Sequence, residues 1–277
     1  MDIINTKNLT MKFKEFYAIK DVSIDVKSNQ IYGLVGKNGA GKTTLMKCLL
    51  GLLPGSSGKI KMFETDNLAE GRRRTGALIE EPGFFKNLTG YQNLMYFSKA
   101  FGINDSAEVL RLLQLLKLSE AKDKNYSLGM KQRLGIALAL IGNPDLLVLD
   151  EPINGIDPEG IVEMRNLFKS LVYDQGKTII ISSHILSEVE NLCDNIAIIE
   201  KGQVIDVIEN HSTKNQITKY VTSLSTDNND KAKEILTKEN ISFKEDKGLI
   251  IEGDIKTSRL LKLMTENEIE IIEFARK

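Results

Sequence analysis

Apolar and polar positions in the first part of the chain form short blocks that predict strands separated by helices. Val22, Ile24 and Val26 alternate with other residues, which is the period of a half-buried strand. Short apolar runs predict buried strands at 31–35, 75–79, 146–149, 178–181 and 196–199. Helical spacing of apolar residues predicts helices at 43–53, 158–173 and 186–193. This order predicts an α/β fold with a mostly parallel sheet.

The middle of the chain lacks the alternation of strands. Segments 93–101, 107–118 and 131–141 instead carry apolar residues at helical spacing. We therefore expect a helical subdomain, at about residues 85–143, inserted between strands of the sheet.

The last part of the chain, after a polar stretch at 209–215, has a different pattern of apolar residues. Strands are predicted at 220–224, 241–244, 249–251 and 269–274, and helices at 231–238 and 257–266. The order β-α-β-β-α-β is that of a small α+β, ferredoxin-like domain. We expect one domain over 1–210 and an accessory domain over 211–277. No catalytic constellation lies in the latter, and a regulatory ligand site there is the alternative.

Composition narrows the class of protein. The 277 residues are 42% hydrophobic and 27% charged, which suits two globular domains. The net charge of -1 argues against nucleic acid as the main partner. Cys48 and Cys193 have no metal-binding or redox spacing, and we expect them to be core residues of a protein in a reducing cytosol. We expect no signal peptide, because residues 1–4 lack a basic region followed by an apolar one. We also expect no membrane-spanning helix, because the best apolar stretch, 134–144, is shorter than the roughly 20 residues needed.

A glycine-rich segment after the strand at 31–35 predicts a phosphate-binding loop. Residues 36–43, GKNGAGKT, fit the pattern GxxxxGK[ST] and lead into a helix. The glycines let backbone N–H groups converge on phosphate oxygens, and the helix N-terminus adds positive charge. Lys42 is expected to reach the β- and γ-phosphates and the Thr43 hydroxyl to bind Mg²⁺. The residues expected to contact nucleotide here are Gly36, Lys37, Asn38, Gly39, Ala40, Gly41, Lys42, Thr43 and Thr44.

Two carboxylates, Asp150 and Glu151, follow the apolar strand at 146–149. Ligands of α/β proteins bind at the carboxyl ends of parallel strands, so these side chains should lie beside the phosphate loop. We expect Asp150 to hold Mg²⁺ and Glu151 to orient and polarise the attacking water. Positioning must carry much of that effect, because a free glutamate with a pKa near 4.3 is a weak base.

Over about residues 1–210 the chain resembles the ATPase subunits of ABC transporters, which have a P-loop NTPase fold. The resemblance rests on the order of motifs. These are Phe13 at the position of an adenine-stacking aromatic, the phosphate loop at 36–44, the signature-like YSLGMKQR at 126–133, the acidic motif at 149–152, GIDP at 155–158 and His184 at the switch position. Phe16 and Tyr17 lie close to Phe13 and leave the aromatic position open.

The resemblance implies a mechanism and partners. Family members bind ATP and Mg²⁺ and work as pairs, so a second copy of the chain is expected. Ser127, Gly129 and Met130 of one subunit would face the γ-phosphate held by the other, with Asp157 in the loop that communicates between them. His184 would stabilise charge on the γ-phosphate. Integral-membrane permease subunits would form the transport path, which places the chain on the cytoplasmic face of the membrane.

Two departures from the family pattern point to a subfamily. Glu80 stands where most members have a metal-sensing Gln, with Glu81 as its neighbour, and Leu128 and Met130 alter the signature. Both features look like ATPases that export peptide antibiotics, of the bacitracin-resistance and lantibiotic-immunity type. Glu80 is still able to bind Mg²⁺. The alternatives are a soluble ABC-type ATPase that acts on nucleic acid or ribosomes, and a nucleotide-binding regulator with low turnover.

Overall fold

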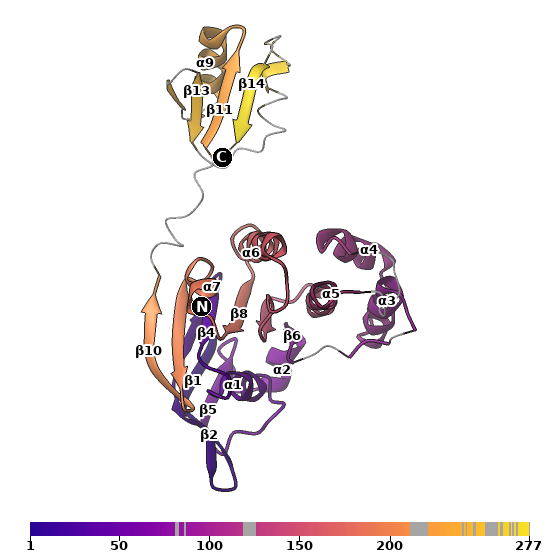
Figure 1. The fold of residues 1–277 in the computed structure, drawn as a ribbon, viewed down its shortest axis with the longest axis vertical. Coiled ribbons are helices and arrows are strands. Elements are labelled where there is room, and N and C mark those ends of the chain that lie inside the picture. Colours follow the sequence, from indigo (N-terminus) through magenta and orange to yellow (C-terminus); the bar gives the residue numbers. More distant parts are fainter. Residues whose placement is uncertain are drawn as a thin grey trace. The chain divides into compact units, whose positions relative to one another are not determined.

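The computed structural model divides into two compact units, Met1–His211 and Ser212–Lys277 (Figure 1). The residues that it describes are 1–80, 83–85, 87–118, 126–210, 221–239, 241, 243–245, 248–252, 260, 263–265, 267, 269 and 271–276. Each unit is a separate body with a hydrophobic core of its own.

A six-stranded sheet forms the centre of the first unit. Its order is β10-β9-β4-β8-β7-β6. The strands are β4 (Ile31–Val35), β6 (Thr75–Leu78), β7 (Leu146–Leu149), β8 (Thr178–Ser183), β9 (Asn195–Glu200) and β10 (Gln203–Glu209). All pairs are parallel except β9 with β10. The predicted mostly parallel sheet is therefore confirmed, and the apolar runs are buried because both faces are covered.

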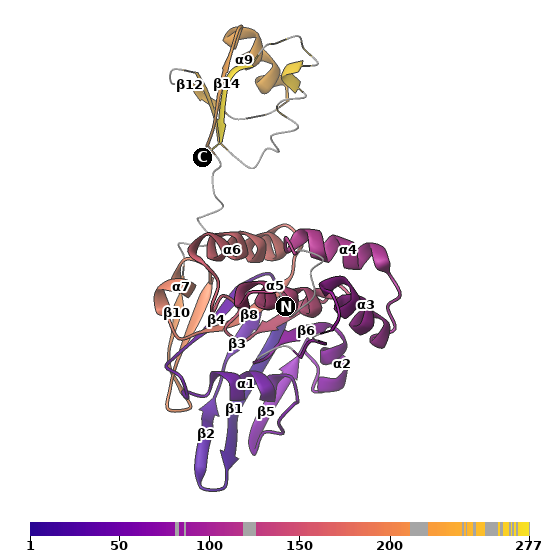
Figure 2. The ribbon, with the colours of Figure 1, turned by 45° about the vertical axis from the view of Figure 1, so that its right-hand side comes forward.

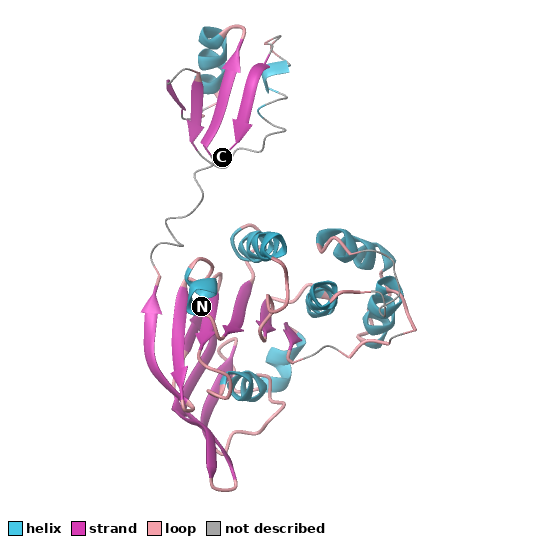
Figure 3. Ribbon diagram, in the orientation of Figure 1, coloured by secondary structure: helices cyan, strands magenta, loops and turns pink. Residues whose placement is uncertain are grey.

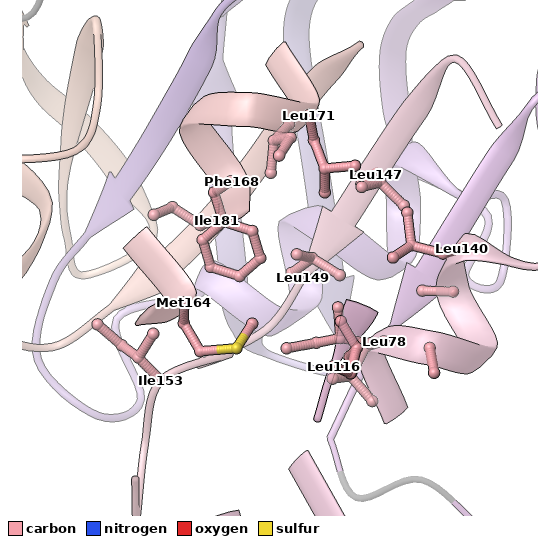
Figure 4. Packing of buried hydrophobic residues seen from close by; sticks show 14 of the residues in the cluster. Leu78, Leu116, Leu140, Leu147, Leu149, Ile153, Met164, Phe168, Leu171 and Ile181 are labelled. Carbon is pink, nitrogen blue, oxygen red and sulfur yellow. The ribbon is translucent and has the colours of Figure 1, made fainter. Parts of the chain in front are cut away.

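The two faces of this sheet carry different partners, and alternate residues of a strand belong to different cores. Leu147 and Leu149 pack with Met164 and Phe168 of α6 (Pro158–Tyr173), as Figure 4 shows. Leu146 and Val148 belong to the opposite cluster, together with the apolar side of α1 (Lys42–Leu49). Residues i and i+2 of a strand share a face, which explains the division. The short helix α7 (Leu186–Glu190) precedes β9.

A second, antiparallel sheet covers the α1 side of the molecule. The central strand β1 (Asp2–Phe13) pairs with β2 (Phe16–Val22), β3 (Asp25–Lys27) and β5 (Ser57–Met62). Two sequence expectations were wrong here. The single strand over Val22 to Val26 is divided between β2 and β3, and β1 and β5 were not predicted. Register shifts interrupt β1 in all three of its pairings, which breaks the two-residue burial period.

Three helices form the expected helical subdomain, which Figures 2 and 3 show beside the parallel sheet. They are α3 (Gly90–Ala100), α4 (Ser106–Leu115) and α5 (Leu128–Leu140), and a shorter helix, α2 (Leu68–Arg73), precedes β6. Capping residues show that two of these helices begin earlier than predicted. Thr89 and Gln92 form a capping box, so α3 begins before residue 93. Ser127 accepts a hydrogen bond from the Met130 amide, so α5 begins three residues before 131.

Three predicted helices also end more than one residue early. The helix expected over 107–118 ends at Leu115, and the Leu118 amide bonds back to the Leu113 carbonyl. The helix expected over 43–53 ends at Leu49, where the backbone N–H groups of Gly51 and Leu52 turn back to bond carbonyls of the last turn. The helix expected over 186–193 ends at Glu190 because Leu192 and Cys193 bond the carbonyl of Val189 in a tight turn.

The thiols of Cys48 and Cys193 are both buried, as expected, and burial raises the pKa of Cys48 to about 11.

The second unit has the predicted ferredoxin-like order. Its elements are β11 (Val221–Thr226), α9 (Asn229–Lys238), β12 (Phe243–Glu245), β13 (Leu249–Glu252) and β14 (Ile271–Arg276). The strands form an antiparallel sheet in the order β12-β13-β11-β14. Of the helix expected over 257–266, residue 260 and residues 263–265 are helical, and the rest lie outside the described residues, as does Tyr220. Strand β12 begins two residues later than predicted and β14 two residues later than the predicted 269.

Candidate active site

The phosphate-binding loop lies between the buried strand β4 and helix α1. Gly39 and Gly41 have φ values of 82° and 109°, which suit glycine, and a Cβ on Gly41 would lie 2.5 Å from the Ala18 carbonyl oxygen. No side chain caps α1. In the part of the chain that the structure describes, no backbone bond outside helices and strands uses the N–H groups of Asn38, Gly39 or Gly41. The loop therefore presents backbone donors and a helix N-terminus suited to an anion.

Lys42 places a buried ammonium group at the centre of this loop. The residue is 5% exposed, and Nζ donates to the Gly36 carbonyl oxygen at 2.6 Å. The same Nζ lies 3.4 Å from Oε1 of Glu151, which joins the loop to the acidic motif through an ion pair. A charge this buried requires such partners. The two motifs that the sequence separates by more than a hundred residues thus meet at one point.

Asp150 holds the other side of this junction. Its Oδ2 accepts a hydrogen bond from Thr43 Oγ1 at 2.8 Å, and its Oδ1 accepts one from Ser182 Oγ at 2.6 Å. The Ser182 hydroxyl in turn accepts the Glu151 amide at 2.8 Å. Asp150 is 6% exposed, so burial and both hydroxyls fix the carboxylate firmly.

The oxygen atoms of Thr43 and Asp150 fit a Mg²⁺ ion. Hydroxyl and carboxylate oxygens are the ligands that Mg²⁺ prefers. Bonds of about 2.1 Å in octahedral geometry place adjacent ligand oxygens about 3 Å apart. The 2.8 Å between Thr43 Oγ1 and Asp150 Oδ2 is close to that separation.

Glu151 is held by contacts on both of its carboxylate oxygens. Oε1 faces Lys42, and Oε2 lies 2.9 Å from Nδ1 of His184. An ionised carboxylate only accepts, so Nδ1 carries the hydrogen and Nε2 of the ring faces away from Glu151. The Gln132 side chain also donates to the Glu151 carbonyl oxygen at 3.0 Å, which connects the signature helix to this residue. His184 is 37% exposed, so solvent and ligands reach the ring.

The signature residues contact the loop at 155–158. Ser127 caps α5 through the Met130 amide. A Cβ on Gly129 would lie 3.5 Å from the Gly155 carbonyl oxygen, so the two segments pack closely. Asp157 is the N-cap residue of α6 but makes no capping hydrogen bond with its side chain. Between described residues, no hydrogen bond joins Ser127, Gly129 or Met130 to the phosphate loop of the same chain.

The aromatic residues lie on the hairpin of β1 and β2. Phe13 pairs with Phe16 across the turn, and both are exposed, at 45% and 65%. Tyr17 is 43% exposed and lies between the ammonium groups of Lys12 and Lys20. The hairpin adjoins the phosphate loop through the carbonyl of Ala18, next to Gly41. The geometry offers three aromatic rings and does not single out Phe13.

Glu80 lies two residues after the end of β6, and its carboxylate pairs with Lys47 of α1 at 2.7 Å. Glu81, the alternative at this position, lies outside the described residues.

Three residues of the site were not predicted from the sequence: Lys47, Ser182 and Gln132. Ser182 could have been found in the sequence, because it directly follows the apolar run at 178–181 and lies two residues before His184. Lys47 is harder to find. Its one sequence clue is that it lies four residues after Thr43, and so on the same face of α1.

Comparison with known proteins places the chain in a family. The family model described as ABC transporter matches residues 19–154. The bacitracin transport ATP-binding protein BcrA of Bacillus licheniformis is 39% identical over 284 residues, covering 98% of this chain and 92% of that protein. The lantibiotic transport ATP-binding protein SrtF of Streptococcus pyogenes is 41% identical over 205 residues, covering 73% of this chain and 89% of that protein.

Solved structures agree. A nucleotide-free ATP-binding cassette from an ABC transporter superposes with a TM-score of 0.68 at 27% identity, covering 78% of this chain and 94% of that one. The dimeric post-hydrolysis state of the cassette MJ0796, bound to ADP and Pi, has the same fold, with a TM-score of 0.68 at 23% identity over 74% of this chain and 98% of that one. The chain belongs to the ABC transporter ATP-binding proteins and is an ATPase.

Proposed function

We propose that this chain is the motor subunit of an exporter that removes antimicrobial peptides of the bacitracin or lantibiotic type, for resistance or self-immunity. The observation that carries the proposal is the junction of Lys42, Glu151 and His184 beside Thr43 and Asp150. It occurs in a chain that is similar along nearly its whole length to a protein named for bacitracin transport.

Hydrolysis follows from the positions of these groups. The loop N–H groups and Lys42 bind the phosphates of ATP and stabilise the charge that develops on the transferred phosphoryl group. Glu151, held by Lys42 and His184, orients a water molecule for attack. His184 presents its second ring nitrogen to the γ-phosphate. Thr43 and Asp150 would hold Mg²⁺, with Glu80 as a further oxygen donor, and the ion would neutralise phosphate charge.

A second copy of the chain completes the site in this proposal. Ser127, Gly129 and Met130 lie at the start of helix α5, whose N-terminus suits an anion, and among the described residues no hydrogen bond joins them to their own phosphate loop. We infer that they close on the ATP of the partner copy. The loop that holds Asp157 packs against Gly129 and transmits that closure to the other site.

A groove at the edge strand β6 is the proposed docking surface for the integral-membrane permease. Its walls come from α3, α5 and β6, with Phe97, Phe101 and Leu138 as apolar lining and Arg72 and Arg73 as basic lining. An amphipathic helix that carries acidic residues suits this groove in shape and charge. None of the helices that the structure describes is long and apolar enough to cross a bilayer. In this proposal the permease, docked in the groove at β6, holds the chain peripherally on the cytoplasmic side of the membrane.

Within this proposal the chain has two domains. Residues 1–210 are the nucleotide-binding domain, with the helical subdomain at about 85–143, and residues 211–277 are an accessory domain. The accessory domain contains an apolar core around Leu224, Leu236 and Leu249 and, in its described residues, no group of metal-binding side chains. The net charge of -1 gives no basic excess that would favour nucleic acid as the main partner.

Ser182→Ala is expected to lower ATP turnover by about 10- to 100-fold, because it removes one hydrogen bond to the Asp150 carboxylate and one to the Glu151 amide. Steady-state hydrolysis by the purified chain measures the loss. Ser183→Ala is the matched control, since the Ser183 hydroxyl bonds Glu188 and the Ile185 amide instead. Equal turnover in the two variants would remove Ser182 from its supporting role.

The transport function is tested in cells that carry the chain with its permease. We expect the wild-type pair to raise the concentration of bacitracin or a lantibiotic that the cells survive, and Lys42→Ala to abolish the gain at equal expression. Growth inhibition over a peptide dilution series measures it. Identical sensitivity with wild type and with Lys42→Ala would reject peptide export.

A further inference from the structure

Helix α1 presents two polar groups to the acidic edge of the sheet, one helical turn apart. Thr43 Oγ1 donates to Asp150 Oδ2 at 2.8 Å, and Lys47 Nζ donates to Glu80 Oε1 at 2.7 Å. Residues i and i+4 of a helix lie on the same face. The helix that begins with the catalytic lysine thus also determines where the Glu80 carboxylate lies.

Glu80 adjoins the metal-binding carboxylate through the backbone. The Asp150 amide donates to the Leu78 carbonyl oxygen at 2.7 Å, and Glu80 follows two residues after Leu78. Glu80 itself has a φ of 59°, in the left-handed region that costs energy for a residue with a side chain. The backbone turns sharply there, and the side chain turns toward α1 rather than continuing along the direction of β6.

The charges at this edge explain why the pair matters. Asp150 and Glu151 lie beside the phosphate loop, and Glu80 adds a third carboxylate one helical turn along α1 from Thr43. Lys42 balances Glu151 and Lys47 balances Glu80, which leaves the charge of Asp150 for Mg²⁺. Without Lys47, a second unbalanced carboxylate would repel the phosphates. The Lys47 side chain is 27% exposed, so solvent screens this charge only in part.

We propose that Lys47 is a positioning residue for Glu80, and that it compensates the negative charge which the chain carries where related ATPases have a neutral glutamine. It holds the carboxylate beside the metal site and keeps its charge from opposing ATP. The inference rests on the proposed function only in taking the phosphate loop as the ATP site. It assigns to Lys47 an electrostatic role at a site that it does not itself touch.

The competing explanation is a surface ion pair without functional effect. Exposed pairs of this kind contribute little to stability, and Glu80 is 63% exposed. Lys47 also lies in the last turn of α1, where a positive charge favours the helix irrespective of Glu80. Neutralising Glu80 as well separates these cases, because it restores the affinity lost with Lys47 only if both charges act on the bound nucleotide.

The experiment measures affinity for a fluorescent ATP analogue in EDTA, so that the readout is independent of metal-loaded turnover. Wild type, Lys47→Met, Glu80→Gln, the double variant and Lys47→Arg are compared at low salt. We expect Lys47→Met to weaken binding about two- to fivefold and Lys47→Arg to bind like wild type. The double variant has the same net charge at this edge as wild type, so we expect it to regain wild-type affinity. Lys27→Met is the control, since Lys27 pairs with Asp2 and Asp25 in the antiparallel sheet.

The expected defect also shrinks at high salt, because screening weakens the repulsion. Thermal unfolding of each variant shows that the fold is retained. Wild-type affinity in Lys47→Met, or a double variant that binds as weakly as Lys47→Met, would overturn the inference, as would a defect of the same size in Lys27→Met. Failure of the proposed function is distinguishable, since wild type itself would then bind no ATP analogue.

Discussion

Glu151→Gln is expected to retain ATP binding while hydrolysis falls by about 10²–10⁴-fold, the usual effect of removing a general base. The amide keeps the size of the side chain and still accepts at one oxygen, but it loses the charge that faces Lys42 and His184. The Gln132 contact survives, because it reaches the backbone carbonyl of residue 151. Single-turnover hydrolysis beside equilibrium nucleotide binding measures both halves of the prediction.

The variant should also accumulate as an ATP-bound dimer, since closure precedes hydrolysis in the mechanism proposed above. Size-exclusion chromatography with ATP tests this. Glu200→Gln, which neutralises an exposed carboxylate at the end of β9, serves as the control and should hydrolyse ATP normally. Turnover by Glu151→Gln within threefold of wild type would show that another group orients the water.

Lys42→Ala is expected to weaken ATP binding by about 10- to 150-fold and to reduce hydrolysis to background. A charged hydrogen bond to phosphate is worth roughly 1.5–3 kcal/mol, which is a factor of this size in affinity. The same change leaves Glu151 without its cation, so a carboxylate then faces the nucleotide unbalanced. Isothermal titration with ATP, at constant salt, measures the loss.

An exposed lysine away from the site provides the comparison. Lys59 lies on β5 and is exposed, and Lys59→Ala should bind ATP as wild type does. The contrast removes any general effect of net charge. If Lys42→Ala kept wild-type affinity, the loop at 36–43 would not be the phosphate site.

The predictable part of the fold follows from burial on both sides of the sheet. Strands such as β4 and β7 consist of apolar residues alone, so their positions are visible in the sequence. Strand β1 escaped prediction because register shifts in its pairing with β2, β3 and β5 remove the regular period. The start of α5 was misplaced because a side-chain cap at Ser127, rather than apolar spacing, determines it.

The candidate site likewise contains residues that the sequence predicts and residues that it does not. Lys42, Asp150 and Glu151 were predictable, because parallel strands deliver the residues at their carboxyl ends to one edge. Ser182 and Lys47 have roles that only the three-dimensional arrangement defines. The first bridges two strands through Asp150, and the second reaches Glu80 from a helix thirty-three residues earlier in the chain.

The central claim is that this chain is an ATPase whose site is completed by a second copy. The most direct test is Mg²⁺-dependent ATP hydrolysis by the purified chain, measured against protein concentration. We expect a rate that rises faster than linearly with concentration and disappears in Lys42→Ala. ATP binding without turnover at any concentration, even with the membrane partner present, would contradict it.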